Sequence, residues 1–157
     1  MNGKLVGGVI VLSALLAGGA IYYLQEYAFY APVAFTPGAE ITLTALTGLP
    51  EPIPVANLQG IDATSSPLRF RACFTTTVNQ PTLTDGFKTY GHATPLNAPS
   101  WFDCFDAQKI GAALETGEAI AFLGQAGIAP QIDRVVAVFP DGRAFAWHQV
   151  NPDALKD

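Results

Sequence analysis

Two cysteines, Cys73 and Cys104, are the residues whose chemistry this sequence constrains most tightly, because the chain contains no other thiol. In an exported domain, a single pair of cysteines usually forms a disulfide bond. The bond would close a loop of about thirty residues and stabilise the domain by roughly 3 to 4 kcal/mol. Redox chemistry or a metal site is the alternative, but the sequence has neither a Cys-x-x-Cys motif nor a second pair of thiols.

Charged and aromatic residues that could bind a ligand or a partner lie close to both cysteines. Two are arginines beside Cys73 and three lie around Cys104: Arg69, Arg71, Trp101, Asp103 and Asp106. A disulfide would place the two segments side by side, since it holds the Cα atoms within roughly 7 Å. The arginines could then form ion pairs with the aspartates and orient the bond. Alternatively, arginine and tryptophan could form a surface for an anionic group or a partner protein.

The two histidines are the remaining candidates for acid–base chemistry or metal binding. His92 lies in a loop next to Gly91, where it could act as a ligand or a proton carrier. His148 alternates with Trp147 on a predicted strand and is expected to face water. The chain has no Gly-x-Ser-x-Gly motif and no paired carboxylates. The sequence therefore predicts no catalytic residues, no metal site and no cofactor, and favours a protein that is not an enzyme.

An apolar segment near the amino terminus is long enough to anchor the chain in a membrane. Residues 5–24, LVGGVIVLSALLAGGAIYYL, contain no charged side chain. A helix of this length covers roughly the 30 Å of a bilayer's hydrocarbon core. Tyrosine and phenylalanine follow at the carboxyl end, as is typical of a membrane interface. We therefore predict a single-pass anchor over residues 1–30, a linker over 31–39 and a domain over 40–157.

The charges beside the anchor predict its orientation. Lys4 precedes the apolar segment and Glu26 follows it, and positive charge normally remains on the cytoplasmic side of a membrane. The amino terminus is therefore expected in the cytoplasm and the domain outside it. A cleaved signal peptide is the alternative, because Gly18, Gly19 and Ala20 offer the small residues that a signal peptidase requires.

Small residues recur along the anchor. Gly7, Ala14 and Gly18 are spaced at helical intervals and so share one face of a helix. Such faces let a second membrane helix approach closely. We predict that this face packs on a partner's membrane helix or on a second copy of the chain, although glycine and alanine are also simply common in membrane helices.

Alternation of apolar and polar residues predicts most elements of the domain. Strands are predicted over residues 40–46, 67–78, 119–123, 134–139 and 144–149. The last two are joined by Pro140-Asp141-Gly142-Arg143, a turn sequence. Between them, these segments favour a mostly antiparallel sheet.

The remaining segments of the domain favour a helix, an extended segment and loops. A helix over 107–115 begins after Asp106 and ends near Gly117. The prolines in 49–55 favour an extended surface segment, and 80–99 is predicted to be loops around a short element at 82–90. The order of elements predicts an α+β domain with one short helix on an antiparallel sheet, and a β-sandwich is the alternative.

The net charge of −5 disfavours some partners. Nucleic acids and anionic lipid surfaces attract clustered lysine and arginine, and the basic residues here are few and scattered. The sequence therefore predicts no nucleic-acid partner.

Several sequence blocks carry a resemblance to a known group of proteins. They are SSPLRFRACFTT (65–76), WFDCFDA (101–107), IGAALETGEAIAFLG (110–124) and DRVVAVFPDGRAFAWHQ (133–149), behind an anchor that ends AIYYLQEYAFY. Together they resemble an uncharacterised bacterial family of small membrane-anchored proteins. The resemblance implies an inner-membrane protein with a periplasmic domain and the same cysteine pair. It implies no particular activity or catalytic residue.

We expect from these features a non-enzymatic accessory protein of the inner membrane, such as a subunit, stabiliser or assembly factor of a larger membrane complex. A membrane-anchored periplasmic sensor or small-molecule binding module is the alternative. A deep pocket containing His92 or the arginines would favour the alternative, whereas an exposed flat apolar patch would favour a protein partner.

Overall fold

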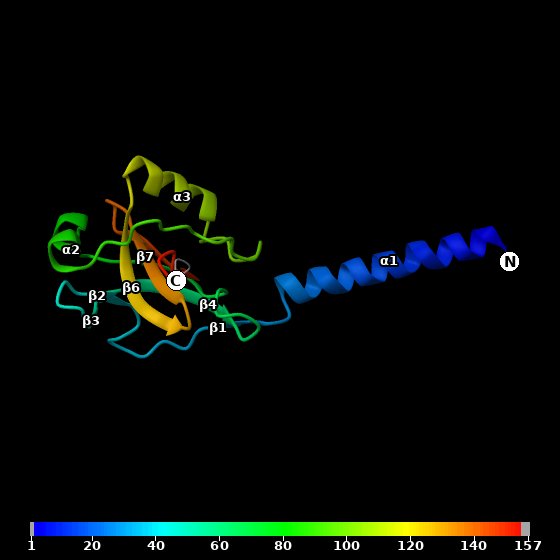
Figure 1. Cartoon of the computed structure of the whole chain (residues 1–157), viewed down its shortest axis with the longest axis horizontal. Helices are drawn as coiled ribbons and strands as arrows, with labels where there is room; N and C mark the ends of the chain where they lie inside the picture. Colours follow the sequence, from blue (N-terminus) through cyan, green and yellow to red (C-terminus); the bar gives the residue numbers. More distant parts are fainter. Residues whose placement is uncertain (1, 155–157) are drawn as a thin grey trace.

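The computed structural model describes residues 2–154, so the last three residues of the predicted domain lie outside it. A long helix, α1 (Gly3–Glu26), projects from a separate sheet domain (Figure 1). Its first turn is capped by Asn2, whose side chain accepts a hydrogen bond from the backbone N–H of Lys4. No residue of α1 is buried, and within the described residues it is the one helix long and apolar enough to cross a membrane.

The domain is built on one antiparallel sheet of six strands. In spatial order they are β1 (Tyr30–Pro32), β4 (Ala56–Ala63), β5 (Arg71–Thr75), β8 (Arg143–Val150), β7 (Ile132–Val138) and β6 (Ile120–Ala129). A separate hairpin consists of β2 (Thr42–Thr44) and β3 (Pro50–Pro52). Two short helices, α2 (Gln80–Gly86) and α3 (Ala107–Thr116), complete the fold. The α+β class and the helix predicted after Asp106 are confirmed. The domain has one short helix more than predicted, because α2 forms where loops around a short element at 82–90 were expected.

Both faces of the sheet are covered, and this decides which side chains are buried. One face packs on the β2–β3 hairpin and α2, and its core includes Phe70, Phe74, Phe122, Val136, Ile41 and Leu83. The other face packs on α3 and the segment before it, and its core includes Cys73, Val135, Trp147, Phe102, Phe105 and Ile110. Successive residues of β5, β7 and β8 contribute alternately to the two cores, as the period of a strand requires.

Two segments that lack a clear strand pattern nevertheless join the sheet. β4 was not predicted at all, and β1 lies where the sequence suggested the end of the anchor and a linker. The chain after β1 also stays on the sheet, since the backbone N–H of Val33 donates to the carbonyl of Gly60 at 2.9 Å. The ring of Phe35 lies directly over Gly60, where any Cβ would collide with it. Residues 31–35 of the predicted linker therefore pack on the domain.

The predicted β7–β8 hairpin is present, and its turn depends on Gly142. This residue has a φ of 86°, which side chains disfavour, and an added Cβ would lie 2.7 Å from the carbonyl oxygen of Thr76. The neighbouring chain is held there because the backbone N–H of Thr76 donates to the carbonyl of Gly142 at 2.9 Å.

We expect Gly142→Ala to lower the free energy of unfolding by about 2 kcal/mol, since a left-handed conformation costs a non-glycine residue roughly 1 to 2 kcal/mol before the contact with Thr76 is counted. Urea unfolding of the full chain in mild detergent measures it. Gly111→Ala is the control, because Gly111 lies inside α3 and an added Cβ there meets nothing within 4 Å. Equal stability of the two variants would contradict the prediction.

Candidate functional site

The carboxyl end of α1 is bonded to the domain through three hydrogen bonds. Arg69 Nη1 donates to the carbonyl of Gln25 at 3.0 Å. The backbone N–H of Ser100 donates to Glu26 Oε2 at 2.9 Å, and Trp101 Nε1 donates to the carbonyl of Glu26 at 2.6 Å. We call these residues, together with Tyr27 and Tyr30, the helix–domain joint. Two of its members, Arg69 and Trp101, were predicted site residues.

Aromatic rings run through the joint from the apolar helix to the domain. Tyr23 stacks on Tyr27 with ring centroids 6.2 Å apart, and Tyr27 stacks on Trp101 at 6.3 Å. Trp101 then meets Tyr30 edge to face at 5.9 Å, and the guanidinium of Arg69 lies 5.3 Å from the centre of the Tyr30 ring. Trp101 is 38% exposed although it has these neighbours. The joint is therefore an amphipathic surface of aromatic rings with one cation.

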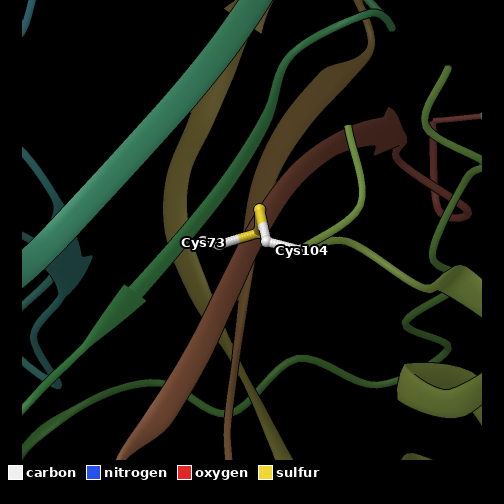
Figure 2. Close-up of a disulfide and its surroundings, with 2 residues drawn as sticks. All are labelled: Cys73 and Cys104. Carbon is white, nitrogen blue, oxygen red and sulfur yellow. A yellow bond between two sulfur atoms is a disulfide. The ribbon is translucent and has the colours of Figure 1, made fainter. Parts of the chain in front are cut away.

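The predicted disulfide between Cys73 and Cys104 is present (Figure 2), and it supports the joint from the domain side. Cys73 lies on β5, and Cys104 lies in the loop three residues after Trp101. The two Cα atoms are 6.2 Å apart. The bond thus ties the loop that carries Trp101 to the centre of the sheet.

Arg71 has a structural role and does not form the predicted ion pair with an aspartate. Its side chain is 3% exposed and donates to four backbone carbonyls, those of Leu68, Phe70, Leu96 and Asn97, at 2.6 to 2.9 Å. Burial lowers the pKa of Arg71 to about 10, which still leaves it charged at neutral pH. Because its donors are committed to the backbone, Arg71 fixes the segments on either side of the joint.

The predicted pairing of arginines with aspartates is wrong. Asp106 caps α3, accepting from the backbone N–H groups of Gln108 and Lys109, and forms a surface ion pair with the Lys109 side chain at 3.2 Å. These bonds hold the pKa of Asp106 below its usual range. Asp103 is exposed at the surface before α3. Arg69 lies before β5 and not on it, which is why its side chain reaches α1 instead.

His92 lies away from the joint. It takes a left-handed backbone conformation with a φ of 57° and lines an open groove of about 740 Å³ between its own loop and α3. Its carbonyl accepts from Gln149 Nε2 at 3.2 Å, and Gln149 Oε1 accepts from Trp147 Nε1 and from the backbone of Thr94. The structure therefore fixes the loop around His92 but does not bring it together with the arginines or with Trp101.

The expectation that His148 faces water is wrong, because the β2–β3 side of the sheet is covered too. His148 is 4% exposed and its ring stacks on Phe70 with centroids 4.5 Å apart. Nδ1–H donates to the carbonyl of Pro67 at 2.7 Å, and Nε2 accepts from Arg134 Nε at 3.0 Å. Burial, with the nearby charges of Arg134 and Arg71, lowers the pKa of His148 to about 4. His148 is therefore a neutral core residue at neutral pH.

The predicted packing face of α1 stands free of the domain. An added Cβ at Gly7 or Gly18 would meet nothing within 4 Å, and Ala14 is exposed. In the described part of the chain no group of three or more histidine, cysteine or acidic residues could hold a metal.

Sequence reasoning missed the helix side of the joint. Glu26 contributes both its carboxylate and its carbonyl, and Gln25 contributes its carbonyl. One signal was available, because Glu26 is the first charge after the apolar segment. Its partner, the loop at Ser100, is distant in the sequence and has no pattern of its own.

Comparison with known families identifies the domain. The model of the family of unknown function DUF6446 matches residues 41–156, about three quarters of the chain. The chain belongs to this family. The match begins just before β2 and contains both cysteines. Three of the seven residues of the joint, Arg69, Ser100 and Trp101, lie inside the DUF6446 domain, whereas the other four belong to α1, β1 and the turn between them, which precede it. No similarity to a curated protein or to a solved structure was found.

Proposed function

We propose that this protein is a non-enzymatic accessory protein of a bacterial inner membrane, a subunit, stabiliser or assembly factor of a larger membrane complex. In this proposal α1 spans the bilayer once with the amino terminus in the cytoplasm, and the DUF6446 domain lies in the periplasm. The packing face of α1, Gly7, Ala14 and Gly18, contacts another membrane helix.

The observation that carries the proposal is the exposure of the apolar part of α1. Large apolar side chains such as Leu12, Leu15 and Leu16 are 59 to 69% exposed, and no part of the domain covers them. Burying apolar surface is worth about 25 cal/mol per Å², so a helix of this kind requires lipid or other helices around it. The charges at its two ends, Lys4 and Glu26, support the orientation.

The joint supports a role at the membrane surface. Glu26 is bonded to the loop that carries Trp101, and Gln25 is bonded to Arg69. Because these two residues directly follow the predicted span, the domain is held next to its end. It is thus placed to contact the membrane-proximal surface of a partner. Of the polar residues that suggested ligand binding, Arg71 is committed to backbone carbonyls. His92 lines the open groove beside α3, which is the feature that supports the alternative of a binding module.

Exchange of small residues on the packing face tests the proposal. We expect Ala14→Leu with Gly18→Leu to reduce co-purification of partner membrane proteins in mild detergent by about tenfold, the factor given by a loss of about 1.4 kcal/mol of helix packing. Leucine is at least as apolar as the residues it replaces, so insertion is retained. No neighbour in the chain is within 4 Å of an added Cβ at Gly18, so the fold is not affected.

The matched control is Gly19→Leu with Ala20→Leu. It changes the same two residue types, but at about 100° per residue both positions point away from the packing face. Retention of the partners by the control and their loss in the test variant would support the proposal. Equal recovery in both variants would contradict the packing face, and wild-type protein that purifies without partners would favour the alternative, a membrane-anchored sensor or binding module.

A further inference from the structure

We propose that the helix–domain joint binds phospholipid headgroups, with the Trp101 ring lying in the membrane interface and Arg69 binding a lipid phosphate. This inference rests on α1 spanning a bilayer, as proposed above, and extends it from the helix to the domain. The domain would then rest on the membrane in one orientation and not hang from a flexible tether.

The stacked rings fix the height of Trp101 relative to the span. Tyr23 belongs to the apolar segment, and Trp101 follows it after a single intervening ring, that of Tyr27. Trp101 also bonds to the carbonyl of Glu26, the first charged residue beyond the segment. A bilayer whose hydrocarbon core of about 30 Å surrounds residues 5–24 therefore has its headgroup region at the level of Trp101.

The chemistry of the joint matches that region. Aromatic rings with one polar atom concentrate at membrane interfaces, where the ring enters the apolar side and the polar atom stays hydrated or bonded. Tyr27, which stacks on Trp101, is 44% exposed and extends the same surface. The Trp101 N–H is already satisfied by Glu26, so the ring can enter the interface without leaving an unpaired donor.

Arg69 supplies a cation at the same level. Its Nη1 donates to the carbonyl of Gln25, and this is the one hydrogen bond that the Arg69 side chain makes to the described residues. No carboxylate among those residues lies within ion-pair distance of it. A guanidinium has five N–H donors arranged to bind phosphate through two of them at once. The guanidinium lies over the ring of Tyr30 and is half-buried, and in this proposal its remaining N–H groups bind the lipid phosphate.

Fluorescence quenching tests this placement on the full chain in phosphatidylcholine vesicles. The chain has two tryptophans, and Trp147 is completely buried in the core of the domain. With lipid brominated close to the headgroup, we expect the wild type to lose up to about half of its emission, the share of one tryptophan in two. Lipid brominated at the acyl-chain ends should quench less, and Trp101→Phe should remove the effect of both.

Arg69 variants test the phosphate contact. Arg69→Gln should weaken quenching of Trp101 by the shallow bromine, because the joint is no longer drawn to the phosphates. Arg69→Lys should retain part of this quenching, because lysine keeps the positive charge but not the paired N–H donors. If Trp101 emission is quenched as strongly in Arg69→Gln as in the wild type, Arg69 does not bind a lipid phosphate.

Flotation of the vesicles separates this inference from the proposed function. A chain that floats with the vesicles but whose Trp101 is not quenched retains its anchor, and the placement of the joint at the headgroups is then overturned. Trp101 would in that case face water or the surface of a protein. A chain that does not float contradicts the span itself, and with it both proposals.

Discussion

Removing the disulfide by Cys73→Ser with Cys104→Ser is expected to lower the free energy of unfolding by roughly 3 to 4 kcal/mol. The bond closes a loop across a sequence separation of 31 residues, and its loss releases that constraint in the unfolded chain. Total stability of a domain this size is on the order of 5 to 15 kcal/mol, so the loss is a large fraction of it. Urea unfolding of the full chain in mild detergent, followed by the emission of buried Trp147, measures the change.

Reduction provides the control for this prediction. A reducing agent should destabilise the wild type by the same amount and leave the double variant unaffected. If free-thiol labelling of the unfolded, unreduced wild type modifies both cysteines, the bond does not form in the protein. We also expect the loop that carries Trp101 to loosen first, because Cys104 is the covalent attachment of this loop to β5.

Acidification is expected to destabilise the domain through His148 by up to about 3 kcal/mol, at about 1.4 kcal/mol for each pH unit between its two pKa values. Its pKa is about 4 in the folded protein against an ordinary 6.5, so the unfolded chain binds the proton more tightly. Stability is therefore fully present above about pH 6.5 and is lost progressively as the pH falls towards 4. Protonation would place a second positive charge against Arg134, whose Nε lies 3.0 Å from His148 Nε2.

The matched variant is His148→Gln, since glutamine can accept from Arg134 and donate to the Pro67 carbonyl but does not titrate. The wild type should lose stability between pH 6.5 and 4 more steeply than the variant. Comparing the two proteins cancels other titrating groups, including Asp62, whose pKa burial raises and whose effect on stability has the opposite sign. Parallel stability profiles would show that His148 is not the responsible group.

The candidate site was only partly predictable. Arg69 and Trp101 were selected because a disulfide would bring their segments together, and they do lie in one site. The reason is different from the expected pairing with aspartates, because Asp106 is used to cap α3. A sequence offers several possible hydrogen-bond and ion-pair partners for each carboxylate, and only the folded structure shows which of them it contacts.

Burial was the other property that the sequence alone did not determine. The period-two pattern correctly placed His148 and Trp147 on opposite faces of a strand. It could not reveal that the β2–β3 hairpin and α2 cover the face away from α3, because those contacts join residues far apart in the sequence. The same holds for Arg71, which occupies an alternating polar position but is enclosed by the loop at Leu96.

Local chemistry explains what the sequence by itself determined. The apolar run of α1, the Asp106 cap and Gly117 end of α3, and the Pro140–Arg143 turn each depend on neighbouring residues, and all four are present. The cysteine pair was determined because there was only one way to pair two thiols.

Tertiary structure alone decided the membership of β1 and β4 in the sheet, since Gly60 interrupts the pattern of β4 and gains its place from the Phe35 ring above it. It also decided the helix–domain joint, where residues 25–30 meet residues 69 and 100–101, because hydrogen bonds between distant segments leave no periodic trace in a sequence.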